Sequence, residues 1–94
     1  MEKPDLQYPV LHLNGIGIEN LRKLYRDATR AVRAATEAVS AANPHGRDYY
    51  VLPGDAYKRA SAEHGERLKM LKRVEDELMA IWLDVQRQED ERKR

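Results

Sequence analysis

Residues 18–42, IENLRKLYRDATRAVRAATEAVSAA, decide the fold, because their apolar side chains recur alternately every three and four residues. The series is Ile18, Leu21, Tyr25, Ala28, Val32, Ala35, Val39 and Ala42. This spacing is typical of the seam between two packed helices, and its alanines allow a partner backbone to approach closely. Asn43-Pro44 follows, and proline cannot continue a helix. We therefore expect one helix over 18–42.

A second run with the same alternation follows the connection 43–55 and predicts a helix over 56–88. Its seam consists of Tyr57, Ala60, His64, Arg67, Leu71, Val74, Leu78, Ile81 and Val85. Asp55 is suited to cap the start of this helix. The apolar face widens around Met79, Trp82 and Leu83, which suggests a second contact. Residues 89–94 are charged, and we expect this tail to fray.

The segment 1–17 precedes the first helix and contains Pro4, Pro9, Gly15 and Gly17, so it cannot be continuous helix. We expect an extended arm. The sequence thus predicts a single all-α domain, 1–94, built as a long antiparallel helical hairpin with an extended N-terminal arm. Phe is absent and there is one Trp, so the core of one hairpin is thin. We expect the hairpins to assemble into a homo-oligomeric helical bundle.

The composition of the chain excludes several kinds of site and several classes of protein. The absence of Cys excludes disulfides and thiolate metal sites and fits a reducing cytoplasm. We find neither a signal peptide nor an apolar stretch of membrane-spanning length, so we expect a cytoplasmic protein with no membrane partner. The net charge of +1 makes nucleic acid an unlikely partner, whereas a small anion held by a few Arg side chains fits.

Two ionisable residues, His64 and Arg67, occupy apolar positions of the second seam. Folding the helices back about the connection pairs Leu78 with Leu21, Leu71 with Ala28, His64 with Ala35 and Arg67 with Val32. A buried Arg without a partner is too costly to keep. Either Arg67 reaches solvent or pairs with Glu37 or Glu63, or both residues line a notch whose occupant is anionic.

The connection supplies a second polar group, Arg47, Asp48, Tyr49 and Tyr50, with Tyr57 just inside the next helix. Arg with clustered Tyr suits a phosphate plus a stacked ring, and equally a protein hot spot. The alternative is structural: a Tyr packs under the loop, and Arg47 and Asp48 form a surface pair.

His12-Leu13-Asn14-Gly15 is a third polar group. For Asn14 and Gly15 the simplest role is a turn and a helix cap. The first helix spans about 37 Å, so His12 starts far from the connection. It reaches that loop only if the arm runs back along the hairpin, or if another subunit brings its own arm there.

The remaining charged patterns indicate no catalysis. Arg22, Arg26, Arg30 and Arg33 form a basic stripe that we interpret as a solvated helix face. His12, His45 and His64 lack metal-ligand spacing, and no glycine-rich phosphate loop occurs. We therefore expect a protein that is not an enzyme and that has neither a cofactor nor a metal.

Several of these motifs together resemble a group of short phage and prophage helical-hairpin proteins. The motifs are His12-Leu13-Asn14-Gly15, Gly46-Arg47-Asp48-Tyr49-Tyr50, Pro53-Gly54, and Glu63-His64 followed by Arg67. The similarity covers most of the chain. The sequence departs from that group at Ile16-Gly17, where a capping Ser or Thr is usual, and at Val51-Leu52, which interrupts the loop. The resemblance implies a virus-encoded accessory protein rather than a housekeeping enzyme.

Our leading hypothesis is a phage accessory protein that binds and sequesters a small phosphorylated ligand in the cytoplasm of the infected bacterial host. The natural candidate is a nucleotide signal of bacterial antiviral defence, held as by a sponge. The ligand-binding residues would be Arg47, Tyr49, Tyr50, Tyr57, His64, Arg67, His12 and Asn14. The alternative is a protein–protein interaction module that inhibits or scaffolds a host or phage protein through Met79, Trp82 and Leu83. A third hypothesis is a DNA-associated accessory factor.

Overall fold

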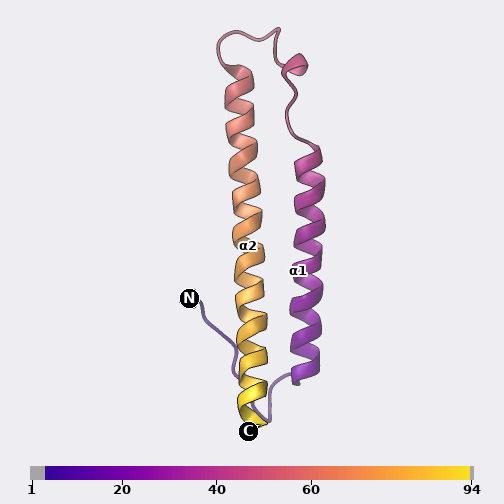
Figure 1. The fold of residues 1–94 in the computed structure, drawn as a ribbon, viewed down its shortest axis with the longest axis vertical. Coiled ribbons are helices and arrows are strands. Elements are labelled where there is room, and N and C mark those ends of the chain that lie inside the picture. The colour runs from indigo at the N-terminus through magenta and orange to yellow at the C-terminus, as the bar shows by residue number, and fades with distance from the viewer. Residues whose placement is uncertain (1–3, 94) are drawn as a thin grey trace.

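The computed structural model describes residues 4–93, and these form two long antiparallel helices (Figure 1). Helix α1 comprises Ile18–Ala41, the short 3₁₀ helix η1 comprises Gly46–Asp48, and α2 comprises Ala56–Arg92. The described part of the chain contains no strand, which confirms the predicted all-α class. Residues 1–3 of the predicted arm and residue 94 of the predicted tail lie outside the described residues.

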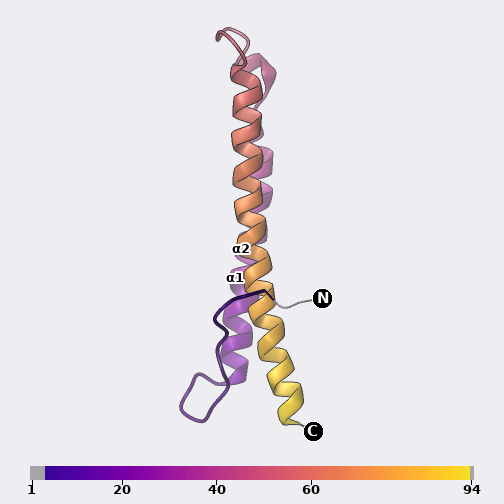
Figure 2. The same ribbon diagram turned by 90° about the vertical axis from the view of Figure 1, so that its left-hand side faces the viewer.

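The molecule is a rod. Its principal extents are 63 × 24 × 20 Å and its radius of gyration is 19.1 Å, against about 12 Å for a compact domain of this length. The side view in Figure 2 shows α1 and α2 running along each other for most of this length. Within the described residues, neither helix is sufficiently long and apolar to cross a membrane.

Helix α1 begins and ends close to the predicted positions. Gly17 precedes it in an extended conformation and supplies no side-chain cap, while Glu19 lies in the first turn, where a negative charge favours the helix dipole. At the other end, the N–H of Ala42 donates to the carbonyl of Val39 at 3.0 Å, which tightens the last turn. Pro44 then prevents further helix, as predicted.

Helix α2 continues past the predicted end, so the prediction of a frayed tail from residue 89 is wrong up to Arg92. Charged and amide pairs one turn apart stabilise this segment. Arg87 pairs with Glu91 at 2.9 Å, and the Gln86 amide donates to Asp90 at 3.1 Å. A run without apolar residues therefore remains helical through its own surface pairs.

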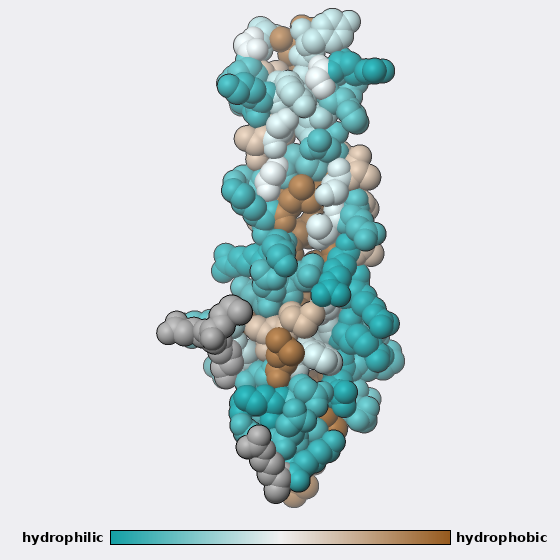
Figure 3. All heavy atoms as spheres, in the orientation of Figure 1, coloured by the Kyte–Doolittle hydropathy of each residue, from teal (hydrophilic) through white to brown (hydrophobic). Residues whose placement is uncertain are grey.

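The contact between α1 and α2 is thin. Among residues 4–93, Val85 is the one apolar side chain that is buried, and most seam residues are half-buried. Thr29 and Thr36 also lie on the inner side of α1, where each hydroxyl donates to the carbonyl four residues earlier. Figure 3 shows apolar side chains as separate brown patches on a largely hydrophilic face. The accessible surface is 7497 Å², against about 5,600 Å² for a monomeric protein of this mass.

The arm, residues 4–17, is neither helix nor strand and lies along the side of α2 that faces away from α1 (Figures 1 and 2). Gln88 holds it there. The Leu11 N–H donates to the Gln88 side-chain oxygen at 3.0 Å, and the Gln88 amide donates to the carbonyl of Pro9 at 2.8 Å. The arm therefore runs back along the hairpin, but on the half of α2 that is far from the connection.

Candidate functional site

The loop end of the molecule has a different register from the predicted one. Arg33 pairs with Glu75 at 3.1 Å, whereas the predicted fold-back places Glu66 opposite Arg33. The shift is about nine residues, or about 13 Å along α2. It arises because residues 42–55 do not turn back at once. They continue past the end of α1 and lie beside the first turns of α2 (Figure 1).

Two tyrosines mark where the connection meets α2. The rings of Tyr49 and Tyr57 lie with their centroids 6.2 Å apart and tilted by 48°, within the range of attractive aromatic pairs. Tyr49 is half-buried, in agreement with the structural role considered for one of these rings. Tyr57 and Tyr50 are exposed, and Tyr50 retains 79% of its surface. The loop end thus offers rings to solvent.

His64 lies two helical turns after Tyr57 on the same side of α2, and it is buried, with 5% of its surface exposed. Its Nε2 atom is buried and has no hydrogen-bond partner among the described residues. The prediction that His64 turns inward is confirmed. A buried ring nitrogen without a partner costs about 1–3 kcal/mol, so this atom is an unsatisfied polar group that a ligand could pair with.

Arg67 does not turn inward, and the prediction of a second buried ionisable residue is wrong. Its side chain is exposed, as the solvent-reaching alternative required. The alternate inner positions of α2 lie one residue later than the apolar spacing predicted. Leu68 and Glu75 therefore take the inner positions that the heptad assigned to Arg67 and Val74.

Arg47, in η1, is also exposed. Neither Arg47 nor Arg67 forms an ion pair with any residue in the described range 4–93. The surface pair between Arg47 and Asp48 and the pairs of Arg67 with Glu37 or Glu63 are therefore not formed. Both guanidinium groups remain free to bind an anion. We call Arg47, Tyr49, Tyr50, Tyr57, His64 and Arg67 the loop-end group.

His12 and Asn14 lie at the opposite end of the rod. The backbone next to them is held by Gln88, which is about 46 Å along α2 from Tyr57. The Gly15 N–H donates to the His12 carbonyl at 3.2 Å, and a Cβ atom on Gly15 would lie 2.9 Å from the His12 ring. Asn14 makes no cap hydrogen bond to α1. One chain therefore does not bring the eight predicted residues together.

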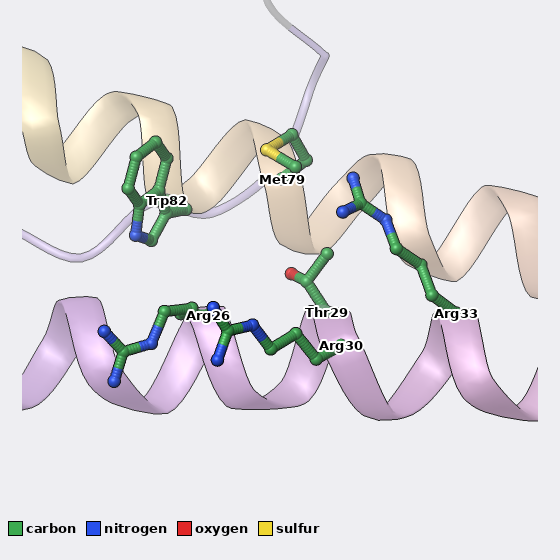
Figure 4. A pocket seen from close by; sticks show the side chains of 6 residues that line it. All are labelled: Arg26, Thr29, Arg30, Arg33, Met79 and Trp82. Carbon is green, nitrogen blue, oxygen red and sulfur yellow. The ribbon is translucent and has the colours of Figure 1, made fainter.

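A pocket that the sequence did not predict lies between α1 and α2 (Figure 4). Its volume is about 200 Å³, and it is lined by Arg26, Thr29, Arg30, Arg33, Met79 and Trp82. We call it the arginine pocket. The arginines belong to the stripe that was interpreted as a solvated face. Trp82 and Met79 line this pocket and are half-buried, so of the predicted outward face only Leu83 is exposed. The predicted register separates these arginines from Met79 and Trp82 by about nine residues, so the sequence did not indicate a pocket here.

A polar cluster near the C-terminal end of α2 was also not predicted from the sequence. The Asp84 side chain is 2% exposed and accepts hydrogen bonds from Arg87 at 3.0 Å and from Gln88 at 3.0 Å. The hydrogen bonds with Asp84 and Glu91 raise the pKa of the Arg87 guanidinium above its usual value. This cluster fixes the Gln88 side chain that holds the arm. A buried Asp among the apolar and charged residues of a helix gives no signal in the spacing of apolar residues.

Comparison of the chain with protein-family models, with curated proteins and with solved structures finds no match. The described residues contain no group of three or more His, Asp or Glu side chains that could hold a metal ion. No relative therefore assigns a role to the loop-end group or to the arginine pocket.

Proposed function

We propose that this protein is a self-associating helical hairpin that captures a small phosphorylated ligand at its loop end and does not convert it. The observation that carries the proposal is the unpaired Nε2 atom of buried His64. It lies two helical turns after Tyr57, whose ring packs against Tyr49 of the connection. Such an atom is paired in most folded proteins, so its partner is expected to come from outside this chain.

The residues of the loop-end group suit the parts of a nucleotide-like molecule. Arg47 and Arg67 would contact phosphate, because a guanidinium group donates two parallel hydrogen bonds to phosphate oxygens. Exposed Tyr50 or Tyr57 would stack on a base. His64 would hydrogen-bond to the ligand through Nε2, which requires the buried ring to turn outward. The rise from Tyr57 to Arg67 along α2 is about 15 Å, so the ligand would lie along the helix.

A second copy would complete the site. His12 and Asn14 are held about 46 Å from the loop end of their own chain, so they reach a loop-end group only in a partner that runs in the opposite direction. The exposed surface supports association. The chain exposes about 1,900 Å² more than a compact monomer of its mass, whereas a standard interface covers about 800 Å² of each partner.

The resemblance to short phage proteins favours one ligand class, the nucleotide signals of bacterial antiviral defence. A virus gains from removing such a signal by tight binding. A sponge of this kind needs a stable assembly and a site that excludes water, and it needs no reactive group. These requirements agree with a rod that carries the residues assigned to the ligand at its two ends, which an antiparallel partner would bring together.

The proposal is tested by calorimetry against a panel of cyclic nucleotides and cyclic ADP-ribose isomers. We expect one member to bind, and Arg47→Gln to weaken its binding at least tenfold through loss of a charged hydrogen bond. The matched control is Arg59→Gln, because Arg59 is also exposed near the loop end but is not part of the loop-end group. Absence of binding across the panel would end the proposal, as would equal weakening by both substitutions.

Sharing of the site between copies is tested with two inactive variants, His12→Ala and Arg47→Gln. Each homo-oligomer should lose binding. When the two are co-expressed, about half of the two-fold pairs contain one copy of each, and each mixed pair has one intact site of two. About a quarter of the sites should therefore recover. If His12→Ala alone binds normally, or if co-expression restores nothing, the arm of a second copy is not part of the site.

A further inference from the structure

The arginine pocket carries a separate inference, because the hydrogen-bonding groups that line it are almost all donors. Arg26, Arg30 and Arg33 contribute guanidinium groups. The indole N–H of Trp82 makes no hydrogen bond within the described residues, and its nitrogen lies on the side of the ring that faces α1 (Figure 4). The Thr29 hydroxyl already donates to the Tyr25 carbonyl at 2.7 Å. A lining of this kind requires an occupant that accepts hydrogen bonds.

The charge of the lining also favours an occupant that is an anion. Arg33 pairs with Glu75, and Arg26 lies 3.6 Å from an Asp27 carboxylate that also pairs with Lys23 at 2.8 Å. Arg30 has no ion pair in the part of the chain that the structure describes. Like charges three or four residues apart on a helix repel each other. The three arginines therefore leave a local excess of positive charge that an anion would neutralise.

The opposite wall of the pocket is apolar. Met79 and Trp82 line it from α2 (Figure 4). An indole face favours stacking with a planar ring, and a thioether makes favourable contacts with aromatic edges. The volume of about 200 Å³ is smaller than the roughly 300–1,000 Å³ of sites for drug-sized molecules. Such a space fits one ring with one anionic group rather than a whole nucleotide.

We propose that the arginine pocket binds a small aromatic anion, a single ring that carries a phosphate or a carboxylate. The anionic group would lie among the guanidinium groups, with Arg30 as its main partner, and the ring would lie against Trp82 and Met79. The pocket is about 27 Å along α2 from His64, so it is distinct from the loop-end group. This inference does not depend on the proposed function.

The single tryptophan makes the test direct, because the fluorescence of the chain comes from Trp82 alone when it is excited at its red edge. The protein is titrated separately with phenyl phosphate, benzoate, inorganic phosphate and benzyl alcohol. We expect a saturable change in Trp82 emission with phenyl phosphate or benzoate, with a dissociation constant on the order of millimolar for so small a ligand. The first two probes distinguish phosphate from carboxylate. Inorganic phosphate should bind more weakly, and the neutral alcohol should not bind.

Arg30→Gln should weaken binding of the aromatic anion at least fivefold, and circular dichroism should show unchanged helix because Arg30 is exposed. The matched control is Arg73→Gln, because Arg73 is an exposed Arg of α2 paired with Glu77. That variant and Arg47→Gln should bind as the unchanged protein does. The proposal is overturned if no aromatic anion gives a saturable change, or if Arg30→Gln binds normally. It is also overturned if Arg30→Gln lowers the oligomeric mass and leaves the probes unbound in both proteins, because the arginines then contact another copy.

Discussion

Replacing Gln88 with Ala should release the arm from α2. The Gln88 side chain forms two hydrogen bonds to the arm, one from the Leu11 N–H at 3.0 Å and one to the Pro9 carbonyl at 2.8 Å. A third bond joins it to Asp84 at 3.0 Å, so its conformation is fixed before the arm docks. Since Asp84 keeps Arg87 as a partner, the substitution leaves no buried carboxylate unpaired.

The magnitude follows from the two lost bonds. Each intramolecular hydrogen bond contributes about 0.5–1.5 kcal/mol, so the arm loses about 1–3 kcal/mol of docking free energy. Arm opening is a local event and should leave the helices folded. The Leu11 amide should then exchange with solvent roughly 5 to 150 times faster, since about 1.4 kcal/mol corresponds to a factor of ten.

Hydrogen exchange, resolved at the Leu11 amide, measures this effect directly. The control is Gln86→Ala, because Gln86 belongs to the same helix but bonds only to Asp90 at the surface. Its replacement should leave the arm docked. If Leu11 exchanges at the same rate in Gln88→Ala as in the unchanged protein, or accelerates equally in the control, the arm is not held by Gln88. His12 and Asn14 would then not be held at the end of the rod opposite the connection.

Three further outcomes concern stability. Val85→Ala should lower the free energy of unfolding by about 2 kcal/mol, measured in urea, because it removes the buried apolar side chain. Gly54→Ala should lower the free energy of unfolding by about 1 kcal/mol, because Gly54 has a φ of 71°. Gly46→Ala should leave it nearly unchanged, because Gly46 has a negative φ and open space around it. The hydrogen bond from Lys23 lowers the pKa of Asp27 below its ordinary value of 3.8. The Asp27 carboxylate therefore stabilises the folded state above pH 3.8, and this stabilisation is lost as the pH falls through the lowered pKa. The stability difference between Asp27→Asn and the unchanged protein should therefore vanish in strong acid.

The helices could be predicted because their signals are local. Apolar spacing in residues 18–42 and the stop at Asn43-Pro44 act within a few turns, and α1 ends at Ala41, one residue before the predicted end. The inward position of His64 followed from the same spacing. Arg67 did not, because Arg67 and Leu68 both fit a spacing of three and four residues between His64 and Leu71, and Leu68 takes the inner position.

The register and the arm could not be predicted, because they depend on contacts between distant residues. The connection could turn back at any of several points, and Tyr49 against Tyr57 is one contact that sets where it does so. An error of about nine residues separated Arg26, Arg30 and Arg33 from Trp82 and concealed the arginine pocket. The docking of the arm rests on the polar side chain of Gln88, which an analysis of apolar periodicity ignores.

The most direct test of the account is native mass spectrometry of the chain, purified gently from bacteria that contain the defence signals. We expect a mass of two or more copies, plus a small molecule that is released on denaturation and contains phosphorus. A single chain without added mass, at tens of micromolar protein, would contradict a ligand site built from the loop end of one copy and the arm of another.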